Sequence, residues 1–163
     1  MIQSLLENYR SESIYDSIEA VKTDIGELLH ETVEEYDSDN RIKYTKPDKE
    51  FTVNIDPDKI QVVFRNIIDN ALKYSNADVI LNVKDGRNTV DITFKDSGVG
   101  ISDEDLKYIF EPFYRSDRSR SRRTGGFGLG LSITKKIMDA HKGEIIFSSR
   151  VNEGTTVTLS FRK

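Results

Sequence analysis

The chain has 163 residues, the length of one ordinary domain, and its 32% charged residues with only three prolines are typical of a folded protein. Its net charge of −4 at pH 7 excludes a general attraction to nucleic acid or to anionic membranes, so we expect no nucleic-acid partner. It has no cysteine, which excludes disulfides and thiolate chemistry, and no apolar run of about 18 residues, so we expect no membrane span in it.

The first residues are expected to lie outside the globular fold. Residues 1–10 carry apolar side chains at helical spacing, but they are too few to form a stable helix alone. Residues 11–23 are mixed and polar, as in a linker. We therefore divide the chain into an appendage, residues 1–22, and a globular domain, residues 23–163.

A helix and two strands are predicted next. Asp24 is a suitable N-cap for a helix that runs to about Tyr36 and carries apolar residues at helical spacing. Residues 41–46 and 50–55 predict two strands that pair with each other, because the second alternates apolar and polar side chains.

The stretch 58–75 predicts the central helix of the domain, with Asp56 and Pro57 before it as start signals. Its apolar side is expected to be buried and consists of Ile60, Val63, Phe64, Ile67 and Ala71. Asn66, Asn70 and Lys73 fall within about 60° of one another on a different side. Two amide groups and an ammonium there can hold a ligand.

The rest of the chain alternates hairpins with helices. The predicted elements are a hairpin of strands 78–84 and 89–95, a short helix at 102–110, a basic loop at 114–126, a helix at 127–141 and a hairpin of strands 143–150 and 154–162. This alternation predicts one sheet with helices on one face.

A carboxylate and two glycines follow a predicted strand in Asp96-Ser97-Gly98-Val99-Gly100-Ile101. Glycine allows a close approach of backbone to a ligand, and a buried carboxylate can accept a hydrogen bond from an amine such as that of adenine. Taken alone, the pattern is more often a plain turn.

A second glycine-rich stretch, residues 125–132, runs into a helix. Free amide groups and the positive end of a helix dipole can bind phosphate there, although a flexible hinge fits the stretch equally well. It is neither a P-loop nor a dinucleotide fingerprint, because no Lys-Ser or Lys-Thr follows the glycines and Leu131 stands in place of the third glycine.

The basic loop between these stretches carries five arginines in residues 115–123. Composition alone favours a solvated loop. A lid that closes on phosphates is the functional alternative, because arginine pairs with two phosphate oxygens at once.

Four segments in this order, NIIDNALKYS, DSGVGI, IFEPFYR and GGFGLGLSI, resemble the asparagine, first glycine, phenylalanine and second glycine boxes of the catalytic, ATP-binding domain of sensor histidine kinases. The resemblance implies an α/β two-layer sandwich of the Bergerat (GHKL) type, with a mixed sheet, helices on one face and a mobile ATP lid. It also implies that residues 1–22 are the remnant of a dimerisation helix and linker. A departure is Lys142, where the family often has glycine.

The resemblance implies ATP and Mg²⁺ as ligands. Asn66 and Asn70 match asparagines that hold Mg²⁺ against the triphosphate, and a neutral amide oxygen can ligate a hard cation without repelling phosphate. Lys73 matches a lysine that faces the phosphates, and Arg115 an arginine near the terminal phosphate. Asn66, Lys73 and Arg115 are the residues expected to act in catalysis.

The base is expected to lie between Tyr74, which matches an aromatic residue packed on adenine, and Asp96, which matches the carboxylate that reads the adenine amine. Phe110 and Phe113 resemble lid anchors that also meet the dimerisation helices. The other residues expected to border the nucleotide are Gly98, Gly100, Ile101, Phe110, Gly126, Gly128, Leu129 and Gly130.

The reaction is expected to be phosphoryl transfer. Hydrolases of the wider superfamily carry a glutamate in place of Asn66, and asparagine lacks the basic lone pair needed to activate water. Of the two histidines, His30 lacks the sequence pattern that follows a phosphoacceptor, and His141 is expected to be structural. The acceptor histidine is therefore expected outside this chain.

The expected partners are a histidine-bearing dimerisation domain of the same full-length protein and a response regulator. We expect a cytoplasmic domain, monomeric alone and homodimeric in the full-length protein, which can be anchored in the inner membrane. Two alternatives remain open: a nucleotide-binding docking module without turnover, and a GHKL-type serine kinase or ATPase.

Overall fold

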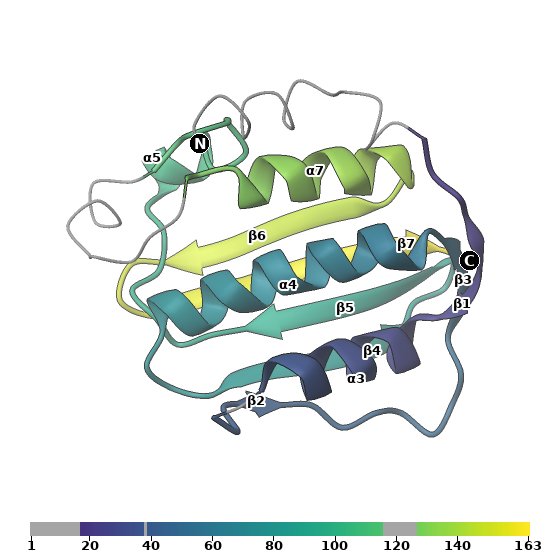
Figure 1. Cartoon of the computed structure of the whole chain (residues 1–163). Helices are drawn as coiled ribbons and strands as arrows, with labels where there is room; N and C mark the ends of the chain where they lie inside the picture. Colours follow the sequence, from purple (N-terminus) through teal and green to yellow (C-terminus); the bar gives the residue numbers. More distant parts are fainter. Residues whose placement is uncertain (1–16, 38, 116–126) are drawn as a thin grey trace.

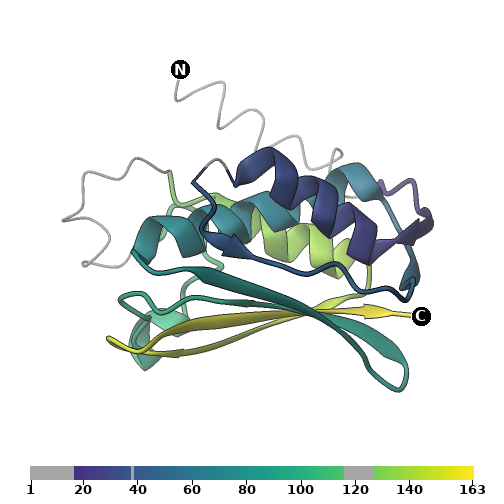
Figure 2. The same ribbon diagram turned by 90° about the horizontal axis from the view of Figure 1, so that it is seen from below.

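The computed structural model describes residues 17–37, 39–115 and 127–163, which form two layers. A mixed sheet in the order β2-β4-β5-β7-β6 is covered on one face by α3, α4 and α7, with α4 in the middle (Figures 1 and 2). In chain order the described elements are β1 (Val21–Asp24), α3 (Ile25–Tyr36), β2 (Ile42–Lys43), β3 (Thr52–Ile55), α4 (Pro57–Tyr74), β4 (Val79–Asp85), β5 (Thr89–Lys95), α5 (Asp103–Leu106), α7 (Gly130–Ala140), β6 (Glu144–Arg150) and β7 (Gly154–Arg162).

The predicted two-layer α/β sandwich is confirmed. Its sheet is mixed because β2 runs parallel to β4, whereas the other neighbouring strands are antiparallel. The predicted helix of residues 1–10 and most of the predicted lid, residues 116–126, lie outside the described residues. No described helix is long and apolar enough to cross a membrane.

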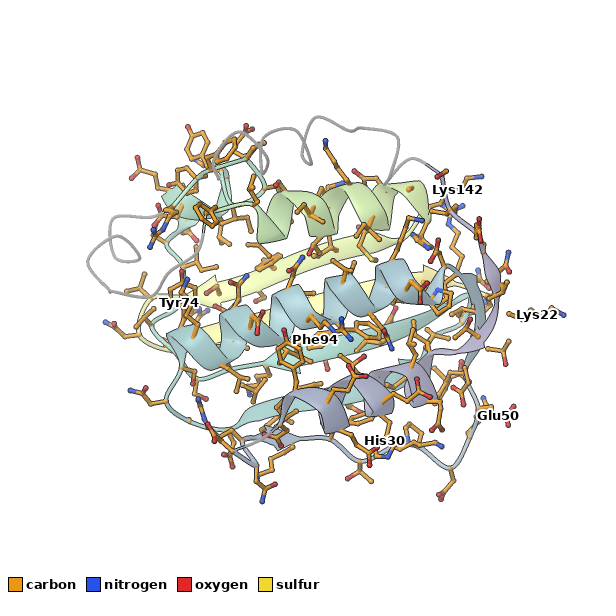
Figure 3. The ribbon with its side chains drawn as sticks, in the orientation of Figure 1. Lys22, His30, Glu50, Tyr74, Phe94 and Lys142 are labelled. Carbon is orange, nitrogen blue, oxygen red and sulfur yellow. The ribbon has the colours of Figure 1, made fainter. Side chains whose placement is uncertain are left out.

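Helix α4 forms the centre of the core, as predicted. Asp56 caps it by accepting a hydrogen bond from the N–H of Lys59 (3.2 Å), and Pro57 occupies its first position. All five residues predicted on its apolar side are buried, together with Ile68. Phe64 packs on Phe94 of β5, which is labelled in Figure 3, with 6.0 Å between the ring centroids, and so joins the helical layer to the sheet.

The predicted pairing of the two strands that follow α3 is wrong. β2 pairs with β4, and β3 pairs antiparallel with β1, so that Val21 lies opposite Ile55. The end of the predicted linker is therefore a strand. Alternating hydrophobicity identified β3 correctly, because Val53 and Ile55 are buried. It could not identify the partner, because tertiary packing decides which strands meet.

Two predicted helices are shorter than expected. Ser102 caps α5 as predicted, but the helix ends at Leu106 and turns follow. Pro112 disfavours helix before it, and Phe113 has a φ of 65°. Helix α7 begins three residues later than predicted because Gly128 has a φ of 73°, which a right-handed helix does not allow.

Helix α7 ends in a Schellman motif that carries lysine where glycine is preferred. The N–H of Lys142 donates to the carbonyl of Asp139, and the N–H of Gly143 to that of Met138, both at 2.9 Å. Lys142 has a φ of 54°, in the left-handed region that disfavours residues with a Cβ atom (Figure 3).

We expect Lys142→Gly to raise the free energy of unfolding by about 0.5 to 1 kcal/mol, because relief of the left-handed strain exceeds the added freedom of the unfolded chain. Urea denaturation measures the change. Lys142→Ala is the control, since it removes the charge and keeps Cβ. An equal gain in the alanine variant would mean that the charge, not the backbone, is responsible.

Candidate functional site

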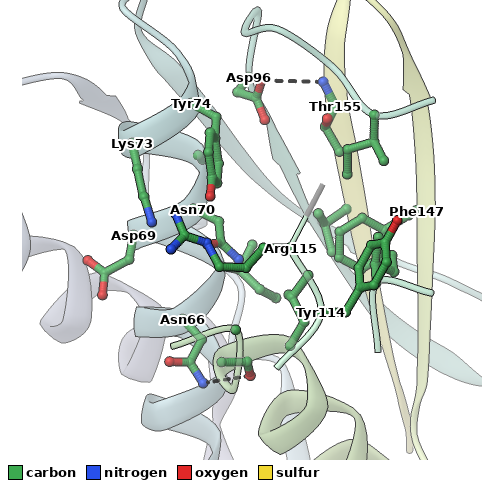
Figure 4. Close-up of a pocket in the computed structure, with 18 of the residues that line it drawn as sticks. Asn66, Asp69, Asn70, Lys73, Tyr74, Asp96, Tyr114, Arg115, Phe147 and Thr155 are labelled. Atoms are coloured by element: carbon green, nitrogen blue, oxygen red, sulfur yellow. Dashed lines mark hydrogen bonds between the residues drawn. The ribbon is translucent and has the colours of Figure 1, made fainter. Parts of the chain in front are cut away.

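A cavity of about 640 Å³ lies beside α4 and brings together most of the predicted site residues (Figure 4). They come from four segments: α4, the end of β5 with its following loop, the residue before the undescribed segment, and the start of α7. The predicted residues that line the cavity are Asn66, Asn70, Lys73, Tyr74, Asp96, Gly100, Ile101, Arg115, Gly128, Leu129 and Gly130. Gly98 and Phe110 do not line it, and Gly126 lies outside the described residues.

Asp96 directly follows β5 and is only 9% exposed. Its Oδ1 accepts hydrogen bonds from the N–H groups of Gly98 (2.8 Å) and Thr155 (3.3 Å). Burial raises the pKa of this carboxyl, and the two N–H groups partly oppose that rise. Because both bonds go to Oδ1, the other carboxylate oxygen remains for a donor in the cavity (Figure 4).

The loop after Asp96 is fixed by the protein backbone. Gly100 has a φ of 67°, and a Cβ there would collide with the carbonyl of Arg150. The N–H of Ile101 donates to Ser149 Oγ (2.8 Å), which ties the loop to β6. Glycine at position 100 is therefore required by the fold, because it lets this wall of the cavity pack against the end of β6.

The polar side of α4 faces the cavity as the helical spacing predicted. Asn66 Nδ2 donates to the carbonyl of Gly130 (3.1 Å) and to Thr134 Oγ1 (3.3 Å), both on α7. Lys73 Nζ lies 5.1 Å from the ring centroid of Tyr74, a cation–π contact. Figure 4 shows Asn70 between Asn66 and the Lys73–Tyr74 pair, near the Arg115 side chain.

Both ends of the undescribed segment 116–126 are anchored near the cavity. The N–H of Phe113 donates to the carbonyl of Gly128 (2.9 Å) across the segment. Tyr114 Oη donates to Asp105 Oδ1 (2.6 Å), and both residues line the cavity. Phe110 packs edge-on against Phe147, a lining residue, with 5.6 Å between the centroids. Phe110 therefore supports the wall from behind.

Some residues that shape the site through contacts between elements were not predicted from the sequence. Arg41 donates to the carbonyls of Leu72 (3.3 Å), Ser75 (2.6 Å) and Ala77 (2.9 Å), and so satisfies carbonyl groups at the end of α4. These contacts fix the last turn of α4, where Lys73 and Tyr74 lie. A basic residue after a short acidic turn gives no sequence signal for this role.

Asp69 also lines the cavity and was missed. Its Oδ2 accepts a hydrogen bond from Tyr36 Oη (3.3 Å) of α3. Its spacing could have predicted this position, because a carboxylate four residues before Lys73 lies on the same face of the helix.

The metal-ligating groups of the cavity suit a cation that is also bound by the phosphates of a substrate. No group of three or more histidine, aspartate or glutamate side chains among the described residues could hold a metal ion. The candidate ligands are neutral amides, and both Nδ2 contacts of Asn66 go to α7, which leaves Oδ1 for a cation. Amide oxygen is a suitable ligand for Mg²⁺, which is usually held by few protein ligands together with substrate phosphates.

A protein-family model described as histidine kinase-, DNA gyrase B- and HSP90-like ATPase matches residues 55–163, the part that contains α4, α7 and every cavity-lining residue. The chain belongs to this family. It is thus an ATP-binding domain of the histidine kinase type, as the motifs predicted. The family match makes ATP the expected ligand of the cavity.

Curated relatives are sensor kinases. The sensor histidine kinase WalK of Bacillus subtilis (strain 168) is 42% identical over 118 residues, 70% of this chain and 19% of that protein. The sensor protein kinase WalK of Staphylococcus aureus is 34% identical over 167 residues, 98% of this chain and 40% of that protein. The chain therefore spans less than half the length of these relatives.

Solved structures confirm the histidine kinase catalytic fold. The catalytic domain of histidine kinase ThkA has a TM-score of 0.69 at 26% identity, covering 89% of this chain and 96% of that one. The mycobacterial sensor histidine kinase MprB has a TM-score of 0.76, with 87% and 97% covered, and at 23% identity it supports the fold alone. The predicted GHKL-type fold is confirmed.

Proposed function

We propose that this domain transfers the γ-phosphoryl group of ATP to a histidine on a dimerisation domain outside this chain, as the catalytic part of a sensor histidine kinase. The observation that carries the proposal is the position of Asn66 on the cavity wall, because the hydrolases of the superfamily use a glutamate there to activate water. An amide cannot take that proton.

The proposed roles follow the geometry of the cavity. Adenine lies at the end formed by Tyr74 and Asp96, and the triphosphate extends along α4 toward Gly130. Asn66 and Asn70 hold Mg²⁺, which supplies neutralising charge to the phosphates when bound. Lys73 and Arg115 stabilise the charge on the transferred group. Gly126 is proposed to border the nucleotide through its backbone, and Gly98 to act indirectly, because its N–H holds Oδ1 of Asp96.

In the proposed reaction, a nitrogen of the acceptor imidazole bonds to the γ-phosphorus while the bond from that phosphorus to the bridging oxygen breaks. ADP leaves with the electron pair, and the imidazole proton passes to solvent. The protein contributes positioning and electrostatic stabilisation and forms no covalent bond of its own.

The two histidines of this chain support an external acceptor. His141 has Nδ1 2.7 Å from the carbonyl of Ile137, and its Nε2 accepts the N–H of Asp56 (3.0 Å). The Nδ1 contact lies within α7, and the Nε2 bond holds the end of α7 against the start of α4, as expected of a structural histidine. His30 lies on α3 beside Glu34 (3.5 Å), and none of the described lining residues comes from α3 (Figure 3).

The proposed partners are a histidine-bearing dimerisation domain of the full-length protein, a response regulator that receives the phosphoryl group, and a second copy in a full-length homodimer. Both WalK relatives are sensor kinases, which supports this assignment. Phe113, which is 49% exposed beside the cavity, is proposed to contact the dimerisation helices together with Phe110. The domain is proposed to act in the cytoplasm.

A labelling experiment tests the function. This chain is incubated with γ-labelled ATP, Mg²⁺ and a separately produced histidine-bearing dimerisation domain. We expect acid-labile, alkali-stable label on the added domain, as phosphohistidine requires, and no label with Asn70→Ala. Acid-stable label would indicate a serine kinase, and release of phosphate without protein label would indicate an ATPase. Label on this chain that disappears in His30→Ala would contradict an external acceptor.

A further inference from the structure

Thr134 is a fully buried polar residue on α7 whose hydroxyl faces another helix. Its Oγ1 lies 3.3 Å from Asn66 Nδ2 of α4. The carbonyl oxygen of Gly130, one turn earlier on α7, lies 3.1 Å from the same nitrogen. Two acceptors on successive turns of α7 therefore lie within hydrogen-bond distance of the nitrogen of one amide.

These contacts fix the orientation of the Asn66 amide. A carbonyl oxygen can only accept, so the amide atom next to Gly130 is the nitrogen. A rotation of the amide by 180° would place Oδ1 against that carbonyl and leave the Thr134 hydroxyl without its N–H donor. The observed orientation thus directs Nδ2 to α7, a bond drawn as a dashed line in Figure 4. Oδ1 is then the amide oxygen that remains for a ligand.

The other buried hydroxyls of the described helices, on α3 and α7, do not bond to a side chain of another helix. Thr32 Oγ1 donates to the carbonyl of Leu28 (2.8 Å), four residues earlier in α3, and Ser132 Oγ donates to the carbonyl of Leu129 (2.8 Å). These are local bonds to the preceding turn of the same helix. Thr134 differs because its hydroxyl contacts a side chain on the cavity wall.

We propose that Thr134 is a positioning residue of the nucleotide site, which holds the Asn66 amide with its oxygen presented to the divalent cation on the triphosphate. The proposal rests on the proposed role of Asn66 as a metal ligand. Without the hydroxyl, the Asn66 nitrogen loses one of its two acceptors at a partly buried position, and the amide is held by the Gly130 carbonyl alone. A less fixed ligand binds the cation more weakly.

Calorimetric titration with a non-hydrolysable ATP analogue, with and without Mg²⁺, tests the proposal. Thr134→Val keeps the shape of the side chain and removes the hydroxyl. We expect it to reduce the Mg²⁺-dependent gain in affinity about 3- to 10-fold, the size of one lost hydrogen bond, and to change Mg²⁺-free affinity less than about twofold. Thr134→Ser should restore the gain.

Thr32→Val is the matched control, because Thr32 is equally buried and its hydroxyl bonds only within α3. If Thr134→Val showed the same Mg²⁺-dependent gain in affinity for the ATP analogue as the unmodified protein, the proposal would be overturned. Asn66→Ala separates the metal-ligand role of Asn66 from the positioning role of Thr134. If Asn66→Ala keeps the Mg²⁺-dependent gain in affinity, the metal role of Asn66 is wrong as well. If Asn66→Ala loses the gain and Thr134→Val does not, only the positioning role is wrong.

A measurement on the unmodified protein keeps the proposal testable if Thr134→Val does not fold. The side-chain NH₂ group of Asn66 is identified in nuclear magnetic resonance spectra by its loss in Asn66→Ala. Because its nitrogen has two acceptors on α7, we expect its protons to exchange with solvent more slowly than those of the exposed Asn82. Equally fast exchange would overturn the proposal.

Discussion

Asp96→Asn is expected to weaken ATP binding about 10- to 100-fold, which corresponds to the roughly 1.5 to 3 kcal/mol of a hydrogen bond to a charged group. In the proposed complex the free oxygen of Asp96 accepts from the exocyclic amine of adenine. The substituted amide presents either a neutral oxygen or an N–H donor to that amine. Titration calorimetry with an ATP analogue measures the loss, and unchanged affinity would remove Asp96 from the site.

The same substitution is not expected to destabilise the free protein. Burial raises the pKa of Asp96 in the folded state, so ionisation of this carboxyl opposes folding, and the cost grows as the pH rises above the pKa of the unfolded carboxyl. The Asn oxygen still accepts the N–H groups of Gly98 and Thr155, and the buried charge is gone. A thermal melt of the nucleotide-free protein serves as the control, and a clear fall in melting temperature would assign Asp96 a structural role instead.

The pH dependence of binding follows from the same carboxyl. The ionised carboxylate accepts from the adenine amine more strongly than the neutral carboxyl does, so affinity is expected to fall as the pH falls through the raised pKa of Asp96. ATP itself also titrates, and the difference between the wild-type and Asp96→Asn profiles cancels that contribution. Parallel profiles for the two proteins would contradict the proposed contact.

Asn70→Ala is expected to abolish most of the effect of Mg²⁺ on ATP affinity, a loss of about 10-fold or more. Asn70 lines the cavity and lies outside the hydrophobic core, so the fold should be retained. Titrations with and without Mg²⁺ measure the effect. The control is Asn82→Ala, which removes an exposed amide from β4. A large drop in the melting temperature of nucleotide-free Asn70→Ala would mean that the residue supports the fold.

Helical periodicity predicted the helices that carry the site. The capping residues Asp24 and Asp56 and the apolar side of α4 were correct, because these features depend on residues a few positions apart. The partner of β3 was not predictable in the same way. The pairing of β3 with β1 depends on how α3 and α4 pack, which the alternation of residues in β3 does not contain.

For the cavity too, features set by neighbouring residues were predictable from the sequence, and contacts between distant residues were not. Four short motifs predicted that Asn70 on α4 and Asp96 after β5 share one site, and both line the cavity. The residues that hold this site in place were not predicted. The contacts of Arg41 with the end of α4, and of Thr134 with Asn66, join residues that are more than 30 positions apart. Neither residue type indicates such a contact by itself.

Calorimetric titration of this chain with a non-hydrolysable ATP analogue, in the presence and absence of Mg²⁺, tests the nucleotide site most directly. The arrangement of amides, lysine and buried carboxylate predicts saturable one-to-one binding that Mg²⁺ strengthens. A folded protein that does not bind the analogue would contradict the proposed ATP site and leave a docking module as the better interpretation.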